Sequence, residues 1–130
     1  MIIIGHRFIP SENFYHVTNI DAIKKTPPSS CVYLDFSEEN LETIKHANNN
    51  DICLALGVKD ITELLYASNL GASYILVHSE FAPLAQNLAN EYLLDAKILA
   101  LIEDENEIEE LALASIDGVI LKNAIIKTPS

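Results

Sequence analysis

Four polar side chains stand at or near the ends of separate apolar segments, where they could do chemistry: Asp35, His78, Glu103 and Lys122. Carboxylates and imidazoles bind divalent cations, so Asp35, His78 and Glu103 are candidate metal ligands. A histidine between carboxylates can act as a general base, and a desolvated lysine can act as a nucleophile. His78 and Lys122 are therefore the candidate catalytic residues.

The apolar segments that carry these residues predict the edge on which they would meet. The segments are Cys31–Phe36, Ile52–Val58, Ser73–His78, Ala96–Ile102 and Gly118–Lys122. Most are apolar throughout, which is typical of parallel strands that are covered on both faces. Because parallel strands end at the same edge of a sheet, we expect the four polar side chains to lie on one rim.

Amphipathic segments separate these strands and predict the helices that connect them. Leu41, Ile44 and Ala47 form one apolar stripe at helical spacing, and the later segments repeat the pattern. Asp60 and Glu63 have the spacing of a capping box, which marks the start of a helix. Strands alternating with helices predict right-handed crossovers and a parallel sheet.

The expected fold class is α/β, a three-layer α/β/α domain with a mainly parallel sheet of five to six strands, flavodoxin-like in kind. The alternative is a half (βα)-barrel that dimerises. The chain of 130 residues has the length of one domain, so residues 1–130 are expected to form a single domain. Residues 31–122 would contain the repeated βα units, and residues 1–30 would form an irregular N-terminal extension with short strands.

The turns that follow the predicted strands are very short, which counts against an elaborate active site. Phe36 is followed directly by Ser37, and His78 by Ser79. The four glycines form neither of the glycine-rich phosphate loops. No cofactor is identified from the sequence, although the acidic and histidine side chains are compatible with a divalent cation.

The charge of the chain restricts its partners. Eight basic and nineteen acidic residues give 8 − 19 = −11 at pH 7. This balance argues against nucleic acids and anionic membranes, which need a basic surface. We expect residues 1–7 not to be a signal peptide. Cys31 and Cys53 lack metal-ligand spacing and are interpreted as buried thiols of a cytoplasmic protein.

The region from Asp35 to Lys122 resembles the layout of response-regulator receiver domains. The stretch 113–122 (LASIDGVILK) is close to the last helix end and strand of that family and ends in a lysine as they do, and Asp35 matches one of the family's metal-binding acids. His78 stands where the family has its phosphoacceptor aspartate, and Phe36 replaces a second acid. The resemblance implies a receiver-like domain that cannot accept a phosphoryl group on aspartate.

The same region is similar to consecutive βα units of aldolase-type barrels that act on phosphorylated keto acids. Residues 70–77 (LGASYILV) look like a helix-to-strand joint of those proteins, and Lys122 falls near their Schiff-base lysine. No acid stands at the family's matching second-strand position near Tyr33, and the glycines of the phosphate site are also missing. A complete barrel needs roughly 200 residues or more, so the resemblance implies a partial barrel that a second subunit could complete.

Two functions follow as expectations. The first is a non-catalytic cytoplasmic domain that acts through contacts with a protein partner or as a homo-oligomer, because the turns are short and the catalytic motifs are degenerate. The alternative is a small enzyme or ligand-binding protein with a cation or metabolite site at the carboxyl ends of the strands, formed by Asp35, His78 and Glu103 with Lys122 nearby.

Overall fold

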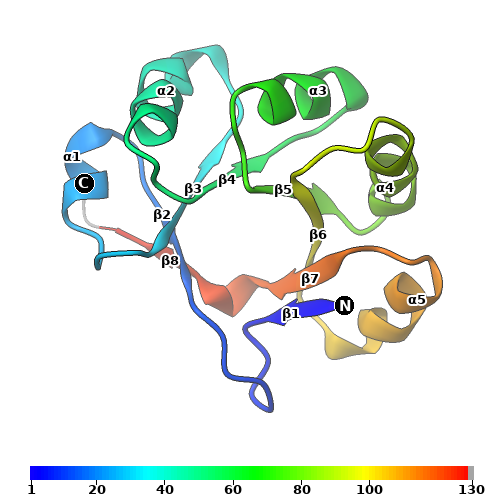
Figure 1. Ribbon diagram of the computed structural model, residues 1–130. Helices are drawn as coiled ribbons and strands as arrows, with labels where there is room; N and C mark the ends of the chain where they lie inside the picture. The colour runs from blue at the N-terminus through cyan, green and yellow to red at the C-terminus, as the bar shows by residue number, and fades with distance from the viewer. Residues whose placement is uncertain (129–130) are drawn as a thin grey trace.

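All strands of the computed structural model, which describes residues 1–128, pair in one parallel sheet (Figure 1). The strands are β1 (Ile2–Ile4), β2 (Phe14–His16), β3 (Cys31–Asp35), β4 (Leu54–Gly57), β5 (Tyr74–His78), β6 (Lys97–Ile102), β7 (Gly118–Leu121) and β8 (Ile125–Lys127). Their order across the sheet is β1-β7-β6-β5-β4-β3-β2-β8, and every neighbouring pair is parallel. The predicted common direction of the central strands is therefore confirmed.

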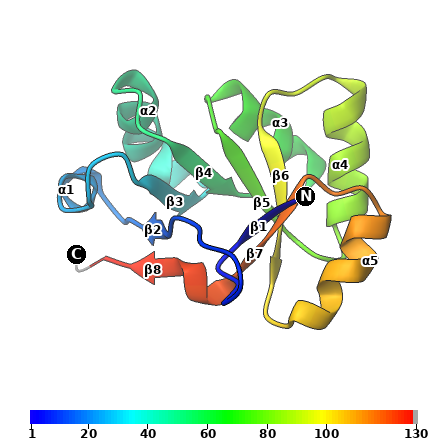
Figure 2. The same ribbon diagram turned by 60° about the horizontal axis from the view of Figure 1, so that its bottom comes forward.

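Helices connect most of these strands. They are α1 (Ile20–Lys24), α2 (Leu41–Asn49), α3 (Ile61–Asn69), α4 (Ala82–Glu91) and α5 (Ile108–Leu113), with the 3₁₀ turns η1 (Glu38–Asn40), η2 (Glu105–Glu107) and η3 (Lys122–Ala124). The sheet curls, and the helices lie around its outer face (Figures 1 and 2). The short turn η3 leads from β7, near one edge of the sheet, directly to β8 at the other edge.

The α/β class with a parallel sheet is confirmed, and the arrangement is the half-barrel alternative rather than the three-layer one. The strands of the central region are adjacent in chain order from β2 to β7, so the sheet has no point at which the order reverses. Eight strands replace the five to six expected. The additional ones are short, since β1, β2 and β8 span three residues each and leave little periodic signal in the sequence.

Alternate residues of each strand pack into two separate cores. Val32 and Leu34 belong to the outer core, between the sheet and the helices. Cys31 and Tyr33 belong to the inner core, which fills the concave side of the sheet. Because successive side chains of a strand point to opposite faces, this alternation decides which polar residues face the concave side. Both cores are apolar, which accounts for the nearly continuous hydrophobic character of the strands.

Residues 1–30, expected to be an irregular extension with short strands, supply β1, β2 and α1. Both strands are paired in the sheet, β1 with β7 and β2 with β3 and β8. The side chain of Asn19 caps α1 by accepting a hydrogen bond of 2.8 Å from the backbone N–H of Ala22. The loop after β1 is held by Glu105, whose carboxylate binds the His6 imidazole at 2.5 Å and the Arg7 guanidinium at 2.6 Å.

The predicted N-cap Asp60 at the start of α3 is confirmed, and the Glu63 side chain of the predicted capping box reaches back to the residue before the N-cap. Asp60 accepts a hydrogen bond of 2.8 Å from the Glu63 N–H, and the Glu63 carboxylate accepts one of 2.9 Å from the Lys59 N–H. These contacts fix the backbone of the tight turn between β4 and α3, and therefore the position from which the Lys59 side chain extends.

None of the helices within residues 1–128 combines the length and the apolar character needed to cross a membrane.

Candidate functional site

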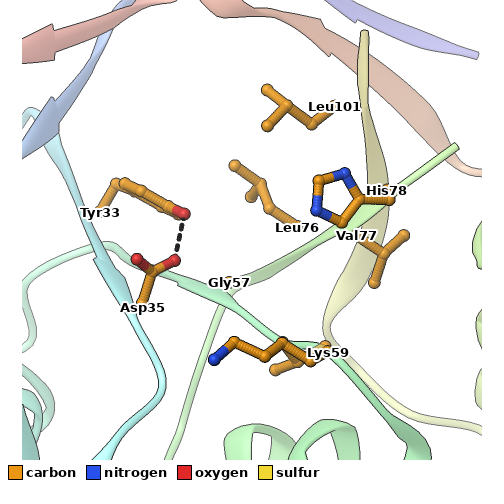
Figure 3. A pocket seen from close by; sticks show the side chains of 9 residues that line it. Tyr33, Asp35, Gly57, Lys59, Leu76, Val77, His78 and Leu101 are labelled. Carbon is orange, nitrogen blue, oxygen red and sulfur yellow. Dashed lines mark hydrogen bonds between the residues drawn. The ribbon is translucent and has the colours of Figure 1, made fainter.

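The carboxyl ends of β3, β4 and β5 surround a cavity of about 240 Å³ on the concave side of the sheet (Figure 3). The residues that line it are Tyr33, Asp35, Gly57, Val58, Lys59, Leu76, Val77, His78 and Leu101. Asp35 and His78 follow inward-facing residues of the inner core, Tyr33 and Leu76, at a spacing of two. The strand alternation therefore directs both polar side chains to the concave side.

Tyr33 and Asp35 form the polar wall of the cavity on β3. The Tyr33 hydroxyl donates a hydrogen bond of 2.6 Å to Oδ1 of Asp35 (Figure 3). The Asp35 backbone carbonyl accepts a further hydrogen bond of 2.8 Å from the Asn40 side chain, which ties the strand end to η1. The carboxylate is thus oriented by a neighbour on its own strand, and it remains exposed to the cavity.

Gly57 on the neighbouring strand makes room for this pair. It stands directly opposite Asp35 in the register of β3 and β4. A Cβ atom at position 57 would lie 2.6 Å from Asp35 Oδ1 and 2.6 Å from the Tyr33 hydroxyl oxygen, closer than real Cβ contacts. The absence of a side chain at Gly57 therefore allows the Tyr33 and Asp35 side chains to meet over β4.

The environment of Tyr33 keeps its phenol protonated. Burial raises the pKa of Tyr33 well above its ordinary value, and the hydrogen bond to the Asp35 carboxylate and its negative charge raise this pKa further. The ring of His16, on β2, packs edge-on against the Tyr33 ring with 5.1 Å between centroids. Tyr33 therefore acts in this site as a fixed hydrogen-bond donor and not as a base.

A lysine and a histidine line the cavity across from the Asp35 carboxylate. Lys59 reaches into the space below Asp35 from the turn after β4, and His78 stands across the cavity at the end of β5 (Figure 3). Neither Asp35 nor Lys59 takes part in an ion pair with another of residues 1–128. The cavity thus presents a carboxylate, an ammonium and an imidazole around an apolar floor that includes Leu76.

Glu103 and Lys122, the other two predicted site residues, lie outside the lining of this cavity. They form an ion pair with each other across the ends of β6 and β7, where their side chains are 70% and 58% exposed. The Lys122 ammonium lowers the pKa of Glu103 by a hydrogen bond and by its charge. Lys122 is therefore exposed and paired, whereas a nucleophilic lysine needs desolvation.

The four predicted residues therefore share one edge, as expected, but divide into two groups. Asp35 and His78 line the cavity, and Glu103 and Lys122 pair beside it. Within residues 1–128, no group of three or more histidine, cysteine, aspartate or glutamate side chains is arranged to hold a metal ion. Asp35, His78 and Glu103 consequently do not converge as a three-residue metal site.

Sequence reasoning missed three residues of this site: Tyr33, Gly57 and Lys59. Tyr33 stands two residues before Asp35 in the sequence, a spacing that places both on one face of a strand. Gly57 at the end of an apolar segment was a second available signal, since glycine in a strand often marks a close approach of another group.

Comparison with known proteins found no protein-family model and no curated protein sequence that matches the chain.

Proposed function

We propose that the chain binds a small metabolite in the cavity at the carboxyl ends of β3, β4 and β5. The observation that carries this proposal is a set of polar groups around the opening, Asp35, Lys59 and His78, that form no ion pair with any other of residues 1–128 and stand above an apolar floor. Binding pockets commonly combine a mostly apolar lining with a few convergent polar groups. The carboxyl edge of parallel strands is also where ligands of such folds bind.

The size and charge of the cavity indicate a dipolar ligand. Its volume of about 240 Å³ is smaller than the roughly 300–1,000 Å³ of pockets for drug-sized ligands, so the ligand would have few heavy atoms. Asp35 would bind a cationic group, and Lys59 would bind an anionic one. An amino acid or a comparable small molecule that carries both an amine and a carboxylate satisfies both residues at once.

A thermal-shift screen tests this proposal. The probes are the free amino acids, with simple amines, simple carboxylates and inorganic phosphate in parallel. A ligand that binds the folded state raises the melting temperature in proportion to the logarithm of its concentration. We expect at least one amino acid to do so, and we expect Asp35→Asn and Lys59→Met each to reduce the shift.

Matched controls lie at the opposite edge of the sheet. Asp95→Asn and Lys97→Met remove the same charges from exposed positions before and at the start of β6, and they should leave the shift unchanged. The proposal fails if no probe raises the melting temperature. It also fails if the shift survives in the Asp35→Asn and Lys59→Met variants, because the ligand would then bind elsewhere.

A second candidate function is self-association through a groove between α2 and α3. The groove has a volume of about 560 Å³ and is lined mainly by apolar groups, including Phe36 and Tyr66, whose rings lie 5.7 Å apart. Tyr66 is 54% exposed. Glu38 and Lys45 also line the groove, and neither forms an ion pair within residues 1–128. In a two-fold dimer, Glu38 of one copy could face Lys45 of the other.

Light scattering after size-exclusion chromatography tests this second function. We expect a dimer whose dissociation constant rises in Tyr66→Ser, while Tyr92→Ser, a comparably exposed tyrosine after α4, leaves it unchanged. Glu38→Lys and Lys45→Glu should each weaken the dimer, and the double variant should restore it. A protein that stays monomeric at the highest soluble concentration rules this dimer out.

A further inference from the structure

Two cysteines face each other at the amino end of the sheet, opposite to the cavity. Cys31 begins β3, and Cys53 directly precedes β4. Val32 pairs with Leu54, and the Val32 N–H donates a hydrogen bond of 2.9 Å to the Cys53 carbonyl, so the two cysteines are opposite one another. Both side chains pack with the inner core on the concave side. They are unlinked thiols in this structure.

The two thiols have different environments. Cys31 is buried, with 3% of its surface exposed, whereas Cys53 is half-buried. The interaction between the two thiols raises the pKa of Cys31 and lowers that of Cys53. Burial raises the pKa of Cys31 further, and Ser73 helps to lower that of Cys53. The more accessible of the two thiols is therefore the one that loses its proton more readily.

We propose that Cys53 and Cys31 form a redox-active dithiol that reduces hydroperoxides. The Cys53 thiolate attacks one peroxide oxygen, the O–O bond breaks, and the released hydroxide takes a proton from solvent to become water. Cys53 is then a sulfenic acid. The Cys31 sulfur attacks the Cys53 sulfur, its proton leaves with the displaced hydroxide as a second water, and a disulfide forms. In total, two thiols and one hydrogen peroxide give one disulfide and two waters.

The geometry of the strand pair supports each half of this reaction. The nucleophile must be an accessible thiolate, and Cys53 is the more exposed of the two cysteines and has the lower pKa. The resolving thiol must lie within bonding reach. Neighbouring strands are about 4.8 Å apart, which falls within the roughly 4.4–6.8 Å between Cα atoms that disulfides span. Directly opposed cysteines can therefore be joined without separating β3 from β4.

This redox site does not depend on the proposed ligand cavity, because the two lie at opposite ends of the strands. Cys31 and Cys53 are at the amino ends of β3 and β4, and Asp35 and Gly57 are at the carboxyl ends of the same strands. Either proposal can fail without the other.

Peroxide oxidation followed by mass spectrometry tests the inference on the full chain. The reduced protein is treated with hydrogen peroxide, denatured, alkylated and weighed intact. We expect a species that has lost two hydrogen atoms and takes up no alkylating group, and that a dithiol reductant returns to the doubly alkylated form. A protein that keeps both thiols alkylatable after peroxide treatment overturns the inference.

Two single variants separate the roles of the cysteines. Cys31→Ser should stop at the Cys53 sulfenic acid, which a dimedone probe traps. Cys53→Ser should react with peroxide more than about tenfold more slowly, because the buried Cys31 remains a thiol. Equal rates in the two variants contradict the assignment of Cys53 as the nucleophile. Circular dichroism of each variant checks the fold, and the wild-type disulfide measurement stands if a variant does not fold.

Discussion

The Tyr33 hydroxyl binds the carboxylate of Asp35, two residues further along the same strand, at a distance of 2.6 Å. Both side chains lie over Gly57, which leaves the space they occupy. A backbone position without a side chain on one strand therefore sets the orientation of a charged group on the next. This relationship makes Gly57 part of the site, although it has no functional group of its own.

Gly57→Ala should destabilise the protein by about 0.5–1.5 kcal/mol, the usual net contribution of a hydrogen bond, because the added methyl group separates the Asp35 carboxylate from the Tyr33 hydroxyl at the cavity wall. The added methyl group would meet Asp35 Oδ1 and the Tyr33 hydroxyl at 2.6 Å each, so one of them must move. Chemical denaturation measures the loss. Asp35→Ala removes one of the clashing groups, and the cost of Gly57→Ala should be smaller in that background. Equal costs in both backgrounds would show that the clash with Asp35 is not the cause.

Tyr33 should make the protein less stable at alkaline pH. Its pKa is raised in the folded state above the ordinary value of 10.0, chiefly by burial. The unfolded chain therefore releases this proton first, so the stability that Tyr33 contributes is complete below pH 10 and falls as the pH rises above it. Between pH 9 and pH 11, the melting temperature of Tyr33→Phe should fall less than that of the wild type.

Tyr66→Phe is the control for this measurement, because Tyr66 is 54% exposed. It should follow the wild-type curve across the same pH range. If Tyr33→Phe also follows that curve, the phenol of Tyr33 is not the cause of the loss of stability at alkaline pH.

Glu105 should contribute to stability in a way that disappears in acid. Its pKa is lowered to about 2, mainly by hydrogen bonds from Arg7 and His6. A carboxylate with a lowered pKa stabilises the folded state above its ordinary value of 4.5 and loses this effect as the pH falls through its folded value. Glu105→Gln should therefore melt below the wild type at pH 6, and the two should converge towards pH 2.

Salt and a neighbouring carboxylate provide the controls for Glu105. The Glu105 and Arg7 side chains are 40% and 64% exposed, so added salt should reduce the difference between Glu105→Gln and the wild type. Glu109→Gln removes an exposed carboxylate of α5 and should have little effect. If the melting temperatures of Glu105→Gln and the wild type still differ by the same amount at pH 2, the effect of the substitution comes from packing and not from charge.

Asp117 should stabilise the pairing of β6 and β7 through one half-buried hydrogen bond. Its carboxylate accepts a bond of 3.0 Å from the N–H of Ile98, a fully buried residue. Asp117→Ala leaves that N–H without its acceptor and should cost about 1–3 kcal/mol in unfolding experiments. Asp117→Asn keeps an acceptor oxygen and should recover much of the loss, and an asparagine variant as unstable as the alanine variant would contradict this explanation.

The strands and helices of residues 31–122 were predictable from the sequence because their signals are local. The segment expected at Cys31–Phe36 forms β3 over Cys31–Asp35, and the one expected at Ala96–Ile102 forms β6 over Lys97–Ile102. Apolar runs bounded by polar residues, with caps such as Asp60, depend on a few neighbouring residues. The carboxyl edge shared by Asp35 and His78 followed from the same pattern, once the strands were taken as parallel.

The curl of the sheet was decided only by the tertiary structure. Flat and curled sheets bury the same apolar runs, so the sequence pattern does not separate a three-layer domain from a half-barrel. Short strands were expected within residues 1–30, where β1 and β2 lie, but their pairing in the sheet and the three-residue strand β8 gave no periodic signal. Curvature also decided which polar groups meet. It leaves Asp35 and His78 facing one cavity, whereas Glu103 pairs with Lys122, because side-chain distances depend on strand position and not on sequence spacing.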